Sequence, residues 1–263
     1  MKATDTYEGL RFSEVDGIGT VTLDRAEKYN TLTSQVISSI SSVLKEVQQS
    51  ESIRVLIIKA TGKAFSTGHD LKEIDEKGTE TFLNKLFTDC SEMMQLIRKI
   101  PQPVIAQVQG IATAAGCQLV ASCDLVVSSA DSIFATNGID NGLYCATPSV
   151  ALSRAVKPKH ALEMLLSGEF IDAARAAELG LVNRVVEKDL LEKETVTLAK
   201  TLASKSLSAL RLGKKSFYEQ INLDIQSAYQ KTSDELVSNI LSAEGQEGIK
   251  AFIERRKPEW TIK

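Results

Sequence analysis

The chain has 263 residues, 43% of them apolar, which is enough to bury a sizeable core and to form one large domain or one and a half. The formal net charge is −3 and lysines and arginines are spread along the chain, so no basic patch indicates a nucleic-acid partner. No apolar run approaches the roughly 18 to 20 residues that a bilayer span requires, and we expect no membrane partner.

The cysteines and histidines do not form a metal-binding pattern. No two cysteines have C-x-x-C spacing, which argues against a zinc site and against a disulfide scaffold. The two histidines, His69 and His160, are far apart in the sequence, so a His-rich metal site is not expected either. We expect reduced, buried thiols at the four cysteine positions, which are Cys90, Cys117, Cys123 and Cys145.

The first residues, MKATDTYEGLRF, do not match a targeting signal. They lack the apolar core of an export signal and the Arg-rich, acid-poor character of a transit peptide. We therefore expect a cytoplasmic protein.

The N-terminal segment is predicted to begin with an antiparallel hairpin, since Asp16-Gly17 separates two alternating segments. The segment SQVISSISSVLKEVQQS then has apolar residues at helical spacing, with Ser34 placed to cap the helix. The continuous apolar run RVLIIKA follows, a pattern typical of a strand buried on both faces.

A second round of the same kind follows along the chain. TFLNKLFTDCSEMMQLIRKI predicts a helix, and PVIAQVQG predicts another buried strand after two prolines. A short helix from about Ala114 and the strands DLVVSS and SIFA complete this round. The alternation of strands and helices implies a layered α/β core.

The composition changes after Thr147-Pro148, where nearly every segment has helical periodicity and only LVNRVV (181–186) resembles a strand. We place a boundary near residue 200. The sequence therefore predicts a core over 1–200 and a helical region over 201–263 that covers the core or makes an oligomer interface.

Two glycine-containing segments follow buried strands, where α/β proteins commonly bind ligands. They are GKAFSTGHDLKEI (62–74) and QGIATAAGCQL (109–119), and both lead toward a helix. A helix N-terminus has main-chain N–H groups without partners, so one N–H from each segment could form an oxyanion hole. Such segments are also often plain turns, and the residues alone leave both interpretations open.

The segments AFSTGHDLKEI, PVIAQVQGIATAAGCQLVASCDLVVSS and LEMLLSGEFIDAARAAELGLVNRVV together resemble the crotonase superfamily, which includes enoyl-CoA hydratases and isomerases. The resemblance covers almost the whole chain. It implies an α/β fold, a crotonase-like ββα superhelix with two roughly perpendicular sheets and a C-terminal helical trimerisation region. Members of this superfamily are typically trimers, often paired into hexamers.

The resemblance also implies a site for an acyl-CoA or enoyl-CoA thioester, with CoA as part of the substrate and no separate cofactor. The thioester oxygen would be held by the main-chain N–H groups of His69 and Ala115. Residues that match CoA-lining positions are Glu27, Lys28, Tyr29, Thr67, Asp70 and Leu71 and, from the tail of a neighbouring subunit, Leu236, Phe252 and Arg255.

This chain departs from the hydratase pattern at both catalytic glutamates. The first position holds Gln118 and the second holds Gly138, while a third acidic position that some members use holds Ala146. An amide cannot exchange a proton near neutral pH, so ordinary hydration is not expected. The main-chain oxyanion hole does not depend on these side chains.

Two side chains remain as candidate acids or bases. Asp140 is the acid nearest to Gly138 in the sequence, although a loop-capping role is the alternative. The His69 imidazole has a suitable ordinary pKa, but it could face other groups or solvent. Tyr144 and Cys145 could face the acyl pocket, which we expect to be bounded by Phe134, Leu143 and the helix over 81–100.

Three functions stay open at this point. The chain could be a working family member with relocated acid–base groups, or one that cleaves thioesters with help from the hole. It could instead bind acyl-CoA without turnover, as a carrier or regulator, or serve as a scaffold through its oligomer surface.

Overall fold

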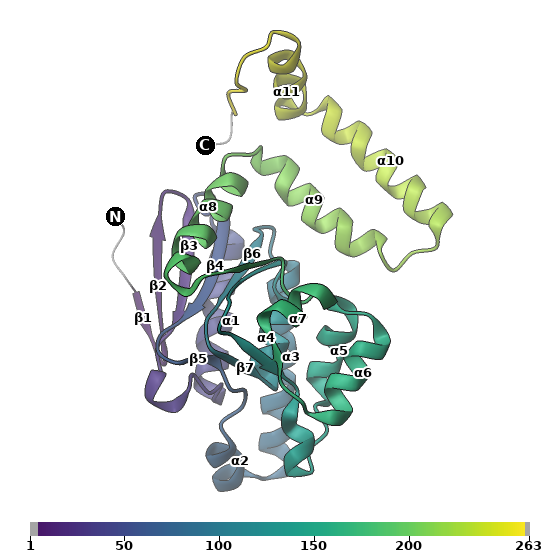
Figure 1. The fold of residues 1–263 in the computed structure, drawn as a ribbon. Helices are drawn as coiled ribbons and strands as arrows, with labels where there is room; N and C mark the ends of the chain where they lie inside the picture. Colours follow the sequence, from purple (N-terminus) through teal and green to yellow (C-terminus); the bar gives the residue numbers. More distant parts are fainter. Residues whose placement is uncertain (1–4, 261–263) are drawn as a thin grey trace.

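The computed structural model describes residues 5–260, which form two sheets surrounded by helices (Figure 1). The predicted hairpin is confirmed: β2 (Leu10–Val15) and β3 (Ile18–Leu23) pair antiparallel, and β1 (Asp5–Tyr7) adds to β2. Asp16 and Gly17 both have positive φ, 51° and 75°, as a two-residue turn between twisted strands requires.

The first long helix, α1 (Ser34–Gln49), buries the predicted apolar face. Its N-cap is Thr33 and not Ser34, because the Thr33 hydroxyl accepts a hydrogen bond from Val36 N. The Ser34 hydroxyl instead donates to the Glu73 carboxylate at 2.6 Å. The buried apolar residues of α1 are Val36, Ile37, Ile40, Val43, Leu44 and Val47.

The larger sheet has seven strands in the order β1-β2-β3-β4-β6-β8-β11. From β3 onward its strands are parallel, and they alternate with helices along the chain. The added strands are β4 (Val55–Ala60), β6 (Val104–Val108), β8 (Leu125–Ser129) and β11 (Arg184–Val186). Only the last three residues of the predicted strand LVNRVV are in β11. The Asn183 side chain, just before them, accepts a hydrogen bond from Val126 N of β8 through its Oδ1.

The smaller sheet has four strands in the order β10-β9-β7-β5. Its members are β5 (Ala64–Ser66), β7 (Ile111–Thr113), β9 (Ile133–Ala135) and β10 (Ile171–Asp172). β5 and β7 begin just after β4 and β6 of the larger sheet, so each buried strand continues into the second sheet. The two glycine-containing segments of the sequence therefore both lead through this smaller sheet.

Helices fill the space around the sheets. α1 packs on α3, and α4 packs on α5. The second round of elements gives α2 (Leu71–Lys77), α3 (Glu80–Lys99) and α4 (Ala115–Ser122), followed by the short 3-10 helix η2 (Asn137–Asn141), α5 (Ala146–Ala155), α6 (Pro158–Ser167) and α7 (Ala173–Leu179). The four cysteines are free and buried, as the sequence predicts.

The helix α8 (Leu191–Ala203) covers the outer face of the larger sheet, where Leu191 and Leu198 pack on Val55, Ile57 and Ile105. This helix crosses residue 200 and belongs by packing to the core. The domain boundary that we place near 200 stays a prediction, and the end of α8 is the physical break nearest to it.

The last three helices stand away from the sheets (Figure 1). α9 (Leu207–Gln220) is tied to the core through Lys214, whose Nζ lies 2.7 Å from the Asp124 carboxylate. The following helices, α10 (Ile225–Leu241) and α11 (Ala243–Ile253), carry exposed apolar side chains such as Leu236 and Phe252. Within residues 5–260, no helix combines the length and the apolarity of a membrane span.

Candidate active site

A cavity of about 1360 Å³ lies where the segments 25–33, 67–77, 111–115 and 137–148 meet. All six residues that match the CoA-lining positions within one chain line this cavity, and so do His69 and Ala115. The sequence thus identified residues that the fold brings together. The six are Glu27, Lys28, Tyr29, Thr67, Asp70 and Leu71.

Two main-chain donors in this cavity lack hydrogen-bond partners. Within residues 5–260, neither the His69 N–H nor the Ala115 N–H donates to a protein oxygen. Ala115 is the first residue of α4, whose opening N–H groups have no partner within the helix. A ligand oxygen in the cavity would satisfy both donors.

The two nitrogens are close together. A Cβ built on Gly68 would lie 3.0 Å from Ala115 N. Standard bond lengths place the His69 nitrogen within about 4 Å of that Cβ, so His69 N and Ala115 N are no more than about 7 Å apart. Gly68 has a φ of +86°, a conformation that glycine adopts without steric cost. One oxygen atom can accept from two N–H groups whose nitrogens lie up to about 6 Å apart, a separation that falls within this limit.

The start of α4 lies directly against the end of β5. A Cβ built on Gly116 would be 2.1 Å from the Ser66 carbonyl oxygen, so only glycine permits this approach. The preceding residue, Ala114, has a φ of 49°, which is strained for a residue with a side chain. Ala114 and Ala115 both line the cavity, so α4 begins at the cavity wall.

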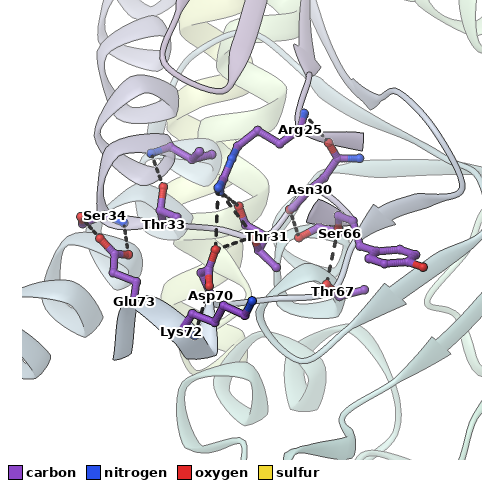
Figure 2. Close-up of polar contacts among 12 residues, drawn as sticks. Arg25, Asn30, Thr31, Thr33, Ser34, Ser66, Thr67, Asp70, Lys72 and Glu73 are labelled. Carbon is purple, nitrogen blue, oxygen red and sulfur yellow. Dashed lines mark hydrogen bonds and ion pairs between the residues drawn. The ribbon is translucent and has the colours of Figure 1, made fainter. Parts of the chain in front are cut away.

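A hydrogen-bond network joins the loop before α1 to the loop before α2 (Figure 2). The Arg25 guanidinium donates to the Thr31 carbonyl and lies 3.7 Å from the Asp70 carboxylate. The Thr31 hydroxyl donates to the same Asp70 carboxylate, which also caps α2 at Lys72 N. The Asp70 carboxylate is therefore engaged in structural contacts that hold the two loops together.

Glu73 is held in the same way. The Ser34 N–H and hydroxyl donate to its carboxylate at 2.9 and 2.6 Å, and Lys77 forms an ion pair with it. Burial alone would raise the pKa of Glu73, but these hydrogen bonds outweigh it and lower the pKa. Glu73 therefore stays ionised and engaged near neutral pH.

The His69 imidazole is a buried neutral group. Burial lowers its pKa to about 4, although the Glu73 carboxylate opposes this shift. Its ring packs edge-on against Phe87 at 5.1 Å between centroids, and Nε2 has no hydrogen-bond partner within the described chain. At neutral pH this side chain is uncharged and has unused hydrogen-bonding capacity.

Gln118 lies on α4 one turn beyond Ala115. Its side chain is buried, and its Oε1 has no hydrogen-bond partner among residues 5–260. Gln118 is not among the residues that line the cavity.

Gly138 lines the cavity, and the surrounding loop leaves no room for a side chain there. A Cβ built on Gly138 would be 2.5 Å from the Leu143 carbonyl oxygen and 2.9 Å from Cys145 Sγ. The Cys145 thiol accepts a hydrogen bond from the Gly138 N–H, while burial raises its pKa. At the second glutamate position of the hydratases, this chain therefore has a glycine, and the surrounding loop leaves no space for a glutamate side chain.

Asp140 receives no geometric support as an acid or base. It is not among the residues that line the cavity, and a Cβ built on Gly168, at the end of α6, would lie 3.0 Å from its Oδ1. The carboxylate lies beside the C-terminal end of α6 and not in the cavity lining, which favours a structural role for Asp140.

The expected acyl pocket is present in part. Tyr144, Cys145 and Leu143 line the cavity together with Phe87 of α3, whereas Phe134 is fully buried in the core. The prediction that Phe134 bounds the acyl pocket is wrong, because its side chain belongs to the hydrophobic core and does not line the cavity. The pocket wall instead includes Phe170 after α6.

The three tail residues expected to act across subunits do not line the cavity of their own chain. Leu236 and Phe252 are 59% and 85% exposed, and Arg255 follows α11 with a positive φ of 55°. Their predicted role in a neighbouring subunit stays a prediction.

Two sheets of this topology, followed by a C-terminal helical extension, define the crotonase fold. A family profile described as enoyl-CoA hydratase/isomerase matches residues 13–263, and the chain belongs to this family.

Similar proteins carry related names. The chain is 47% identical to mouse mitochondrial enoyl-CoA hydratase domain-containing protein 3 over 246 residues, 94% of this chain and 82% of the relative. The crystal structure of the human protein of that name superposes with a TM-score of 0.94 at 46% identity, covering 96% of this chain and 100% of that one. An enoyl-CoA hydratase structure from Mycobacterium smegmatis gives a TM-score of 0.94 at 43% identity, covering 96% and 98%.

The cytoplasmic expectation is wrong. The mouse, rat and human relatives, at 46 to 47% identity, are all named mitochondrial. The expectation rested on the composition of the first residues, but targeting is encoded by segments that are separate from the folded domain and are removed from it.

Proposed function

We propose that this chain binds an acyl-CoA thioester in the cavity and holds the thioester oxygen with the N–H groups of His69 and Ala115. The observation that carries the proposal is the pair of unpartnered donors, close together in one cavity. The pantetheine and nucleotide parts of CoA would follow the residues 27–29 and 67–71, which line the same cavity. No further cofactor is needed, because CoA is part of the substrate.

The two donors would polarise the thioester carbonyl. They stabilise negative charge on the oxygen when an enolate or a tetrahedral intermediate forms, and each is worth about 3 kcal/mol in a transition state. The α4 N-terminus adds the positive end of the helix dipole. This part of the chemistry is supplied by the main chain and does not require Gln118 or Gly138.

Ordinary hydration is not supported. Hydration needs one group to activate water and another to deliver a proton, and each typically contributes about 10²- to 10⁴-fold. Gln118 and Gly138 supply neither, and Asp70 and Glu73 are engaged in structural contacts. We therefore expect crotonyl-CoA hydration to be at least about 10⁴-fold slower than with both acids present.

The catalytic form of this proposal is isomerisation or thioester cleavage that relies mainly on the hole. The neutral His69 imidazole is the group best suited to exchange a proton there, since it lines the cavity and has an unpartnered nitrogen. A second candidate function is acyl-CoA carriage without turnover. The orientation of Asp140 toward Gly168, away from the cavity, favours that candidate.

We propose that the assembled protein is a homotrimer, or a pair of trimers, in which Leu236, Phe252 and Arg255 complete a neighbour's CoA site. The exposed apolar side chains of α10 and α11 support this assembly. The names of the relatives support a mitochondrial location for the chain.

The function is tested with two ligands of matched length. Loss of enoyl absorbance on mixing with crotonyl-CoA measures hydration. Calorimetry with butyryl-CoA, which has no double bond to hydrate, measures binding. Butyryl-CoA binding with negligible hydration supports the proposal. Hydration at a rate typical of enzymes, about 10 s⁻¹, would show that the missing acids are unimportant, and absence of butyryl-CoA binding would refute the site.

A further inference from the structure

Ser66, the last residue of β5, lies between the two proposed donors. Its side chain is completely buried and does not line the cavity. It is one residue from Thr67 and two from Gly68, and its carbonyl oxygen lies against Gly116 of α4. The resemblance to hydratases assigns it no role.

The Ser66 hydroxyl makes two hydrogen bonds. It accepts one from Gly68 N at 3.3 Å. It donates the other to the Asn30 carbonyl at 2.9 Å (Figure 2). The first bond holds the turn at Gly68, which fixes the direction of the His69 N–H. The second bond ties this turn to the loop that carries Lys28 and Tyr29.

Asn30 makes the other end of this link rigid. It is 1% exposed, and its Oδ1 accepts a hydrogen bond from Arg25 N at 2.8 Å. Its Nδ2 donates to the carbonyls of Thr61 and Ala64, both at 2.8 Å. Because the amide is bound on both sides, the Asn30 carbonyl is a fixed anchor for the Ser66 hydroxyl.

The Ser66 carbonyl reaches the second donor. Gly116 lies so close to this oxygen that a Cβ would be 2.1 Å away, so a movement of Ser66 displaces the first turn of α4. That turn begins with the Ala115 N–H. One residue therefore controls both sides of the hole, through its hydroxyl on the His69 side and its carbonyl on the Ala115 side.

We propose that Ser66 is the positioning residue of the oxyanion hole and sets the spacing between the His69 and Ala115 donors. This inference rests on the proposed function, because it concerns the hole that holds the thioester oxygen. It predicts that loss of the Ser66 hydroxyl weakens polarisation of the thioester more than it weakens binding of CoA.

The test compares Ser66→Ala with Ser128→Ala, which removes an equally buried serine hydroxyl from β8, outside the cavity lining. Butyryl-CoA labelled with ¹³C at the thioester carbon is bound to each protein, and infrared difference spectra give the shift of its carbonyl stretch. Calorimetry gives the affinities for butyryl-CoA and for CoA. Ser66→Cys, nearly isosteric, is measured in the same way in case the alanine variant is too unstable.

Ser66→Ala is expected to lose roughly half of the carbonyl shift, since one of two donors is released. Its affinity for butyryl-CoA should fall about tenfold relative to its affinity for CoA, while Ser128→Ala keeps both values. An unchanged shift, or an equal loss of both affinities, would overturn the role of Ser66. Absence of any carbonyl shift in the wild-type protein would instead count against the proposed function itself.

Discussion

Gly116→Ala offers a direct test of the contact between α4 and β5. A Cβ at this position would be 2.1 Å from the Ser66 carbonyl oxygen, where ordinary van der Waals contacts begin at about 3.4 Å. The first turn of α4 must therefore move by about 1 Å, and the Ala115 N–H moves with it. A misplacement of about 1 Å can cost about 10²-fold in a rate that depends on geometry.

The expected loss in ground-state binding is smaller than the loss in rate. One hydrogen bond to the thioester oxygen is worth about 1 kcal/mol, so butyryl-CoA affinity should fall about fivefold to tenfold, while CoA affinity stays near the wild-type value. Any thioester turnover that is found should fall about 10²-fold. Calorimetry with the two ligands and a rate assay with butyryl-CoA give these values.

The matched control is Gly213→Ala, at a helical glycine of α9 where a Cβ meets no atom of residues 5–260 within 4 Å. This variant should be neutral or slightly more stable, because alanine is favoured over glycine in a helix by about 1 kcal/mol. If Gly116→Ala binds butyryl-CoA as tightly as the control does, the reasoning from the α4–β5 contact is refuted.

Three further results are expected. Because the pKa of His69 is about 4 when folded and about 6.5 when unfolded, its contribution to stability is complete above pH 6.5 and is lost as the pH falls toward 4. The unfolding free energy of wild type relative to His69→Gln should therefore fall by about 3 kcal/mol between pH 7 and 4 in urea titrations, and a pH-independent difference would contradict this. Gly138→Glu should lower the unfolding free energy by about 1 to 3 kcal/mol and should not restore hydration, since the new Cβ would meet the Leu143 carbonyl oxygen. A gain of about 10²-fold in the rate of crotonyl-CoA hydration would show that the loop can adapt. Lys214→Met should cost about 3 kcal/mol in thermal or urea unfolding, because the partly buried Asp124 carboxylate is left without its cation. A cost under about 1 kcal/mol would show that other contacts hold α9.

The parts of the fold that the sequence predicts well are those with a strong local signal. The Asp16-Gly17 turn and the apolar face of α1 are confirmed because backbone conformation and apolar spacing decide them locally. The predicted cap of α1, Ser34, is wrong by one residue, because a serine and a threonine hydroxyl can each accept the capping hydrogen bond. The Ser34 hydroxyl donates to Glu73, which lies far along the chain, and the Thr33 hydroxyl caps the helix instead.

Some residues of the candidate site could also be predicted from the sequence, and others could not. His69 and Ala115 could be found because each lies in a recognisable segment at the end of a strand. Ser66 and Asn30 could not, because their importance depends on hydrogen bonds between segments that only the fold brings together. The closed space at Gly138 is also a property of the folded loop, since Leu143 and Cys145 fill it from further along the chain.

The proposed donors at positions 69 and 115 are peptide nitrogens, and this has a consequence for how the protein is dissected. Truncating either side chain leaves the hydrogen on the nitrogen, so an alanine scan of the cavity would pass over both groups and assign their effect to neighbouring residues. Exchange of the amide for an ester at one of these positions, by semisynthesis or through an incorporated hydroxy acid, deletes the donor itself. Replacement of the backbone amide is therefore the experiment that can assign an effect to each of these donors.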